Sequence, residues 1–224
     1  MIASDDEAWI KYTQYRWLFN KLEVAQRLGY DSGPSGVPIT EAKYYIIRPT
    51  YNLFGMGIGA EKKYLDPKLH NEEIINCKYI VPGYFWCEYF DGPHYSIDFK
   101  RENGEWQPFS AIEGTHVTED NLVKFEKWEV IEPPIVLPKL LQEIDAEYMN
   151  VESKGDKIFE VHLRSGNDMA WHTPIGTIFY PVWSSSDYSA LSDLEFVGNY
   201  YDDITKYEAD GLLKDVRLGF YKDK

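Results

Sequence analysis

The sequence has no long apolar run and no basic, apolar leader. No uninterrupted apolar stretch approaches the ~18 residues that a membrane-spanning helix needs. The first residues, MIASDDEAW, carry acidic side chains where a secretory signal peptide has a basic segment followed by an apolar core. These absences predict a chain that is neither inserted in a membrane nor exported, so the expected location is the cytoplasm.

Cysteines and basic residues are also scarce. The two cysteines, Cys77 and Cys87, form no C-x-x-C motif, which favours a reducing compartment over a disulfide-built scaffold. Lys and Arg number 23 against 37 Asp and Glu, so the formal net charge is −14. Because nucleic-acid backbones are bound by basic faces, the sequence predicts no nucleic-acid partner. Internal repeats and low-complexity tracts are absent as well.

Apolar and aromatic residues are plentiful. Of the 224 residues, 44% are hydrophobic and 16% aromatic, including 18 Tyr and 7 Trp. A chain of this size buries roughly 70–75% of its unfolded surface, so one domain or two small lobes is expected. The aromatic surplus has two interpretations: the rings fill the core, or they form a surface that anchors a partner.

Several segments have a clear secondary-structure pattern. Residues 7–28 have mostly three-and-four apolar spacing that ends at Gly29, which predicts an amphipathic helix. A short helix is predicted over residues 135–147. Strands are predicted for KYYIIR (43–48), for HYSIDFKR (94–101) and for KIFEVHLR (157–164), and Asn103-Gly104 predicts a hairpin turn. This mixture predicts an α+β fold.

The segment KIFEVHLR carries three titratable groups on one face. Glu160, His162 and Arg164 alternate with apolar residues, and a buried sheet face does not tolerate such groups without partners. Glu152 lies on the preceding predicted strand, and a hairpin through SKGDK would bring it beside Glu160. Two carboxylates facing one cleft suit Mg²⁺, which binds through one or two carboxylates plus substrate phosphates. The alternative is a solvated sheet face with surface charges.

The stretch IIRPTYNLFGMGIG (46–59) places Arg48 just before three glycines, Gly55, Gly57 and Gly59. Glycines let backbone amides approach phosphate oxygens closely. A dinucleotide fingerprint is excluded, because PTYNLF separates the glycines from the strand and no crossover helix follows. No GKS or GKT follows, so a Walker loop is excluded as well. The alternative is a flexible hairpin whose glycines serve its turns.

Four stretches in order resemble motifs of the ATP-grasp fold: NKLEVAQRLGYDSGPSGVPI, YYIIRPTYNLFGMGIGA, FWCEYFDGPHYSID and NVESKGDKIFEVHLRSG. They are similar to that family's "DK" helix, its strand and glycine-rich lid, its hinge, and its closing strand pair. The resemblance covers residues 18–170. It implies two small α+β lobes whose antiparallel sheets enclose a nucleotide cleft. The expected lobes are approximately residues 1–85, with the lid, and residues 86–224, with metal-binding strands.

The resemblance implies a role for each matching residue. Lys21 stands in the "DK" helix, and Arg48 stands where a strand lysine contacts ATP phosphates. The nucleotide contacts implied farther along the chain are the lid residues Gly55, Gly57 and Gly59, the adenine-edge backbones of Cys87 and Phe90 with Glu88 beside them, and His94 at the ribose. Glu152 and Glu160 would hold Mg²⁺, and Arg164 would act with Arg48 as a catalytic residue on the transferred phosphoryl group.

Three positions depart from the family pattern. Arg48 replaces a lysine but keeps the charge and gains a bidentate fork. His94 replaces an acid at the ribose. His162 replaces an asparagine beside the metal, where imidazole is a poor Mg²⁺ ligand that would touch phosphate or shift the preference to Mn²⁺. The N-terminal lobe usual in the family is also missing. Compact members of this kind occur in viruses of bacteria, which suggests a phage origin.

The function implied is an ATP-dependent ligase. Such an enzyme activates a small-molecule or peptide carboxylate as an acyl phosphate for attack by an amine or another nucleophile. The three departures leave a second hypothesis open: a degenerate module that binds a nucleotide or a protein partner without turnover.

Overall fold

The computed structural model describes residues 4–51, 57, 59–76, 78, 81–119, 122–166, 173–184, 194–198 and 217–222. Its helical elements are α1 (Asp5–Lys11), the 3-10 helix η1 (Thr13–Phe19), α2 (Lys21–Arg27), α3 (Pro67–Ile75) and α4 (Lys139–Gln142). None of the helices in the described part of the chain is long and apolar enough to cross a membrane.

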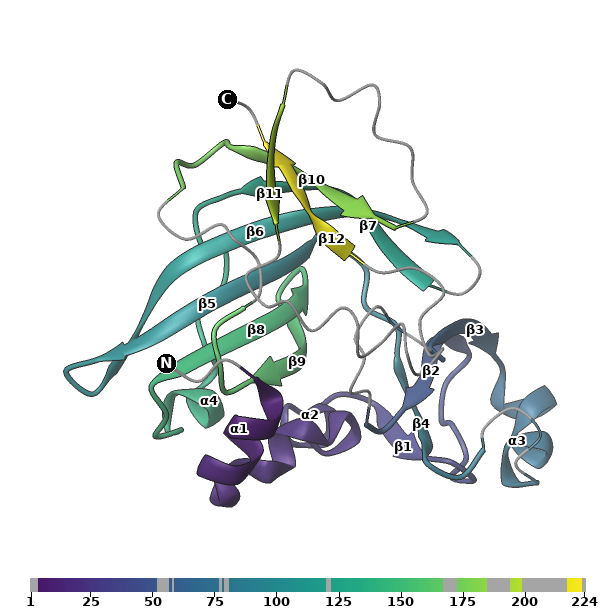
Figure 1. Ribbon diagram of the computed structural model, residues 1–224. Coiled ribbons are helices and arrows are strands. Elements are labelled where there is room, and N and C mark those ends of the chain that lie inside the picture. Colours follow the sequence, from purple (N-terminus) through teal and green to yellow (C-terminus); the bar gives the residue numbers. More distant parts are fainter. Residues whose placement is uncertain are drawn as a thin grey trace.

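The strands pair into two antiparallel sheets (Figure 1). The four-stranded sheet has the order β1-β4-β2-β3 and contains β1 (Ser32–Pro34), β2 (Lys43–Pro49), β3 (Glu61–Leu65) and β4 (Tyr84–Glu88). The eight-stranded sheet has the order β11-β12-β10-β7-β6-β5-β8-β9 and contains β5 (His94–Glu102), β6 (Glu105–Glu119), β7 (Leu122–Val130), β8 (Tyr148–Lys154), β9 (Lys157–His162), β10 (Ile178–Trp183), β11 (Glu195–Gly198) and β12 (Arg217–Lys222). The predicted α+β class with antiparallel sheets is therefore confirmed.

The single helix predicted over residues 7–28 is wrong. The backbone leaves the helical region at Tyr12 (φ −110°, ψ 58°) and again at Asn20 (φ −93°, ψ 100°), which separates α1, η1 and α2. The Asn20 side chain accepts a hydrogen bond from the Glu23 amide, which caps the start of α2 and favours a new helix there. The helix predicted over residues 135–147 shortens to α4, which begins directly after Pro138.

The predicted hairpin turn at Asn103-Gly104 is confirmed. Both residues have positive φ, +52° and +86°, as a two-residue hairpin turn requires. The turn joins β5 to β6 with Glu102 opposite Glu105. It sets the register of β5, and β5 in turn pairs with β8.

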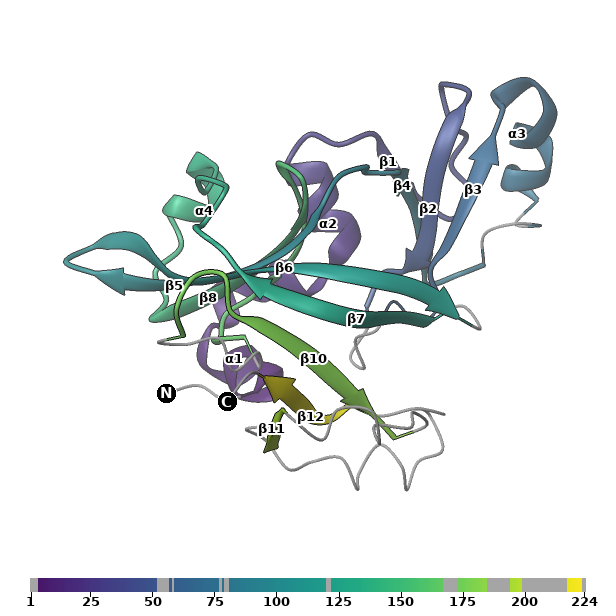
Figure 2. The same cartoon turned by 90° about the horizontal axis from the view of Figure 1, so that it is seen from above.

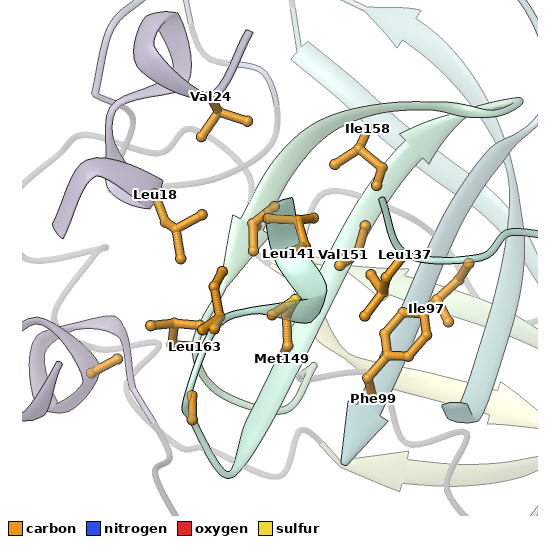
Figure 3. Close-up of a cluster of buried hydrophobic side chains, with 14 of the residues drawn as sticks. Leu18, Val24, Ile97, Phe99, Leu137, Leu141, Met149, Val151, Ile158 and Leu163 are labelled. Carbon is orange, nitrogen blue, oxygen red and sulfur yellow. The ribbon is translucent and has the colours of Figure 1, made fainter. Parts of the chain in front are cut away.

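The main core lies between the eight-stranded sheet and the N-terminal helices (Figure 3). Leu18 of η1 and Val24 of α2 pack with buried residues of the sheet, among them Ile97, Val151 and Val161. Because side chains alternate along a strand, His94, Ser96 and Asp98 lie on the opposite face of the sheet from Ile97. The sheet thus has one apolar face and one polar face in the region of β5, β8 and β9.

Helix α2 connects the two sheets. It contacts β1 and β4 of the smaller sheet and β9 at the edge of the larger one. Both views place the smaller sheet and α3 to one side of the larger sheet, beyond α2 (Figure 1 and Figure 2). A side chain at the start of α2 therefore lies at the junction of the two sheets.

Candidate active site

The β8–β9 hairpin brings two glutamates together. Glu152 and Glu160 are directly opposed in its register, and Ser96 of β5 is opposite Glu152 on the other side. Opposed residues of an antiparallel pair project from the same face of the sheet. The predicted pairing of the two acidic strands is therefore confirmed, and both carboxylates belong to the polar face.

Glu160 is surrounded by three cationic groups. Its Oε2 lies 2.5 Å from Lys21 Nζ and 3.4 Å from Arg48 Nη2, while its Oε1 lies 3.3 Å from His162 Nε2. Burial tends to raise the pKa of Glu160, but Lys21, His162 and Arg48 together hold that pKa well below its usual value. Because Arg48 belongs to β2, this cluster joins the smaller sheet to the larger one.

Lys21 is almost completely buried, at 4% exposure. Burial lowers the pKa of its ammonium group, although Glu160 opposes the shift. A buried charge is tolerated only when it is paired, so Lys21 depends on Glu160 to remain charged. The pair fixes the start of α2 against β9.

His162, predicted as a metal ligand, has carboxylates beside both of its ring nitrogens. Its Nδ1 lies 3.0 Å from Asp5 Oδ1, and its Nε2 faces Glu160. Burial opposes protonation of the ring, but Asp5 and Glu160 raise its pKa to about 9. Both ring nitrogens therefore carry protons at neutral pH, and a protonated imidazole has no lone pair to give a metal ion.

Arg164 is held by Asp5 as well. Its Nε and Nη2 donate to Asp5 Oδ1 and Oδ2 at 3.0 and 3.2 Å, and its Nη1 donates to the Ser165 carbonyl at 3.0 Å. Asp5 is a site residue that the sequence pattern does not reveal. No local pattern could have revealed it, since Asp5 and Arg164 lie 159 residues apart.

His94 lies beside the acidic pair within an aromatic wall. The residue is 8% exposed, and its ring packs edge-on against Phe125 and Phe159 at centroid distances of 4.9 and 5.3 Å. Its Nε2 is 3.3 Å from Glu152 Oε2, and this contact holds the Glu152 pKa low although burial acts in the opposite direction. The structure thus places His94 next to a candidate metal ligand, whereas the sequence predicts a ribose contact.

The hinge residues lie at the end of β4. Cys87 is a buried free thiol whose pKa is raised to about 12 by burial, so it is not a nucleophile. Glu88 accepts a hydrogen bond from the Asp31 amide and pairs with Lys43 Nζ at 3.6 Å. These contacts link β4 to β2 and to the residue before β1, and they occupy the Glu88 side chain in the absence of a ligand.

Phe90 follows β4 and stacks edge-on against Tyr30 at 4.7 Å. Cys87 is paired on both sides within the sheet, by β1 and by β2. Phe90 lies beyond the ladder, and its backbone takes part in no turn hydrogen bond within the described ranges. Of the two backbones predicted to contact adenine, the Phe90 backbone is the one with hydrogen-bonding capacity left for a ligand.

The predicted glycine lid is described only in part. Gly55 lies outside the described residues. Gly57 and Gly59 have φ of +64° and +75°, which is the left-handed region that glycine adopts without strain. A Cβ on Gly59 would lie 2.7 Å from the Tyr84 hydroxyl oxygen, so the glycine is needed for space as well.

The cluster around the two glutamates contains unmet hydrogen-bonding capacity. Three of its buried nitrogens have no hydrogen-bond partner, namely Lys21 Nζ apart from its ion pair, Arg48 Nε and His94 Nδ1. An unsatisfied buried polar group costs roughly 1–3 kcal/mol, so such groups are rare in the absence of a ligand site. Lys21 Nζ and Arg48 Nε are donors, and they fit an oxyanion with several acceptor oxygens, such as a phosphate chain.

The same cluster fits Mg²⁺ as a partner of phosphate. Within the described ranges, no group of three or more His, Cys, Asp or Glu side chains is arranged to hold a metal ion. Glu152 and Glu160 alone supply the two carboxylates that Mg²⁺ uses when phosphates complete its coordination. The donor set therefore suits a cation that arrives with a nucleotide.

A separate open hollow of about 510 Å³ lies elsewhere on the surface. Its lining includes Lys11, Tyr12, Arg101, Asp145 and Glu147, and it shares no residue with the cluster. Both side chains of the Lys11–Glu147 ion pair in its lining are exposed, so this pair contributes little stability. The buried charges at the sheet junction are the stronger candidate for a functional site.

Two antiparallel sheets that meet at a charged junction define the ATP-grasp-like fold, and solved structures share it. The chain is similar to N5-carboxyaminoimidazole synthetase from Staphylococcus aureus in complex with ADP, with 11% identity and a TM-score of 0.58 over 95% of this chain and 69% of that one. It is also similar to the Aspergillus clavatus synthase in complex with ADP and 5-aminoimidazole ribonucleotide, with 10% identity and a TM-score of 0.51 over 96% and 70%.

The chain also matches an L-amino acid ligase from Bacillus licheniformis, with 12% identity and a TM-score of 0.44, over 66% of this chain and 40% of that one. It thus spans less than half of that ligase. No protein-family model and no curated protein sequence matches the chain. At these identities the likeness establishes the fold, while activity and substrates belong to the proposals below.

Proposed function

We propose that this chain binds Mg²⁺-ATP between its two sheets and activates a carboxylate as an acyl phosphate. The observation that supports this most is the buried cluster of Lys21, Arg48 and Glu160. It spans both sheets, and it leaves Arg48 Nε without an acceptor and Lys21 Nζ with only its ion pair to Glu160. A phosphate chain would satisfy those donors with charge-assisted hydrogen bonds.

The other parts of the nucleotide have places in the same region. The Phe90 backbone would meet the adenine edge, and the glycine segment of Gly57 and Gly59 begins shortly after Arg48 and would cover the phosphates. Glu152 and Glu160 would hold Mg²⁺, with Mn²⁺ as the alternative. When bound, the cation would neutralise charge on the phosphates.

The proposed reaction has two steps. In the first, a carboxylate oxygen of the substrate attacks the γ-phosphorus, the bond from that phosphorus to the β–γ bridging oxygen breaks, and ADP leaves. In the second, an amine attacks the acyl carbon, the C–O bond to phosphate breaks, phosphate leaves with the electron pair, and the amine loses a proton. The chain contributes positioning and charge neutralisation through Lys21 and Arg48.

Binding without turnover is the second candidate function. It is favoured by one observation: Asp5 already occupies Arg164 and His162, the groups expected nearest the transferred phosphoryl group. Phosphate release in the presence of varied carboxylates and amines separates the two functions. ADP formation that requires both a carboxylate and a nucleophile supports the ligase, and binding with no release across the screen supports the second candidate.

Thermal unfolding tests the nucleotide site directly. ADP at a hundred times its Kd is expected to stabilise the chain by about 2.7 kcal/mol, which raises Tm by roughly 5–10 °C. Glu152→Gln is expected to remove at least half of the additional shift that Mg²⁺ produces, and to leave the shift with ADP alone unchanged. Glu143→Gln, at an exposed position, is the matched control. The absence of any shift at millimolar ADP would contradict the proposal.

A further inference from the structure

The carboxylate of Asp5 lies in a cationic fork made by two consecutive polar-face residues of β9 and the segment that follows it. His162 Nδ1 and Arg164 Nε both lie 3.0 Å from Asp5 Oδ1, and Arg164 Nη2 lies 3.2 Å from Oδ2. The two oxygens of one carboxylate thus take the paired contact that a guanidinium offers to any carboxylate or phosphate. The fork is therefore an oxyanion subsite that a residue of the chain itself fills.

The segment that delivers Asp5 has one residue in the core. Ala8 is the only buried residue of α1, whereas Trp9 and Ile10 are 38% and 73% exposed. The chain is anchored again at Tyr12, which is 6% exposed and whose hydroxyl accepts a hydrogen bond from the Glu147 amide. Because Ala8 packs in the main core and Trp9 packs edge-on against Phe19, α1 is held in place, and a ligand would displace only the Asp5 side chain, which is 29% exposed.

The subsite adjoins the proposed reaction centre. His162 Nε2 contacts Glu160, and Glu160 is paired with Lys21 and Arg48. An oxyanion in the place of the Asp5 carboxylate would therefore lie next to the phosphate-binding cluster. That is the position required of the carboxylate that is activated, or of the acyl phosphate that it forms.

We propose that Asp5 closes an oxyanion subsite formed by His162 and Arg164, and that a carboxylate or phosphate group of the reaction binds there by displacing the Asp5 carboxylate. The inference rests on the proposed function for the identity of the oxyanion, but not for the competition itself. Asp5 and the ligand exclude each other. In the chain without substrate, the Asp5 carboxylate therefore neutralises the charge of His162 and Arg164. Substrate binding and the release of the Asp5 carboxylate are then one event.

Anion titration of Asp5→Asn tests the competition. The variant keeps the size of the side chain but loses the charge that competes for the fork. It is expected to bind inorganic phosphate or acetate at least tenfold more tightly than the unchanged chain, measured by titration calorimetry. The anion whose affinity increases more shows whether the subsite binds a phosphate or a carboxylate group. Asp6→Asn, one position along on an exposed side chain, is the matched control and should change neither affinity.

Three outcomes overturn the proposal: unchanged or weaker binding of both anions by Asp5→Asn, an equal gain in Asp6→Asn, or failure of Asp5→Asn to fold. The last would show that the carboxylate is a fixed part of the structure. Asp5→Glu retains the competing charge and should bind anions as weakly as the unchanged chain.

ADP titration separates this proposal from the nucleotide proposal. A gain in anion affinity with no ADP binding in either chain would retain the subsite and remove the proposed function. ADP binding with no gain in anion affinity would retain the proposed nucleotide site and remove the subsite.

Discussion

Glu160→Gln is expected to lower the free energy of unfolding by about 3–5 kcal/mol, although the two side chains have nearly the same shape. The loss arises because Lys21 is 4% exposed and Glu160 is the acid paired with it, at 2.5 Å. Removal of one partner leaves a buried charge uncompensated, which is far more costly than loss of an exposed pair. In a thermal melt the change corresponds to a fall in Tm of roughly 10 °C.

The double variant Lys21→Met/Glu160→Gln provides the control. It removes the buried charge together with its partner, so more than half of the lost stability should return, as measured by denaturant unfolding of all four members of the cycle. Glu143→Gln, on the exposed surface, should change stability by less than about 0.5 kcal/mol. If the double variant is no more stable than Glu160→Gln, the assignment of Glu160 as the partner of Lys21 is wrong.

Arg48→Met is expected to weaken ADP binding about 100-fold. The guanidinium lies between the sheets, with Nη2 on Glu160 and with Nε lacking a partner. Two charge-assisted hydrogen bonds to phosphate, at about 1.5 kcal/mol each or more, give a loss of roughly 3 kcal/mol. Titration calorimetry with ADP measures the effect.

Adenosine is the control ligand for this variant. It lacks phosphate, so its affinity should be the same for Arg48→Met and for the unchanged chain. Arg48→Lys keeps a positive charge but loses the two-pronged guanidinium. Its affinity for ADP should lie between that of Arg48→Met and that of the unchanged chain. An equal loss of ADP and adenosine affinity in Arg48→Met would mean that the residue supports the fold of the site and does not contact phosphate.

The alternating segments allowed much of the fold to be predicted. The pattern KIFEVHLR separates an apolar face from a titratable one, and the hairpin that follows from it does place Glu152 opposite Glu160. The Asn103-Gly104 turn is similarly local, since it depends on two residues that tolerate positive φ. In both cases the information is contained within a few neighbouring residues.

The electrostatic partners could not be predicted in the same way. Lys21 and Glu160 are far apart in the chain, and periodicity carries no information about such a pair. The sequence neighbours of His162 indicate a metal site, but its two ring nitrogens face Asp5 and Glu160, and these carboxylates raise its pKa to about 9. The long N-terminal helix failed for a related reason, because tertiary contacts of Tyr12 and a side-chain cap at Asn20 outweigh helical spacing.

The most direct test of the account is a crystal structure with a nonhydrolysable ATP analogue and Mn²⁺, whose anomalous scattering locates the ion. The account predicts phosphate oxygens within hydrogen-bonding distance of Lys21 Nζ and Arg48 Nε, and the ion within about 2–2.3 Å of carboxylate oxygens of Glu152 and Glu160. An analogue bound away from the sheet junction, with Glu160 still closed on Lys21 and no ion beside it, would contradict the central claim.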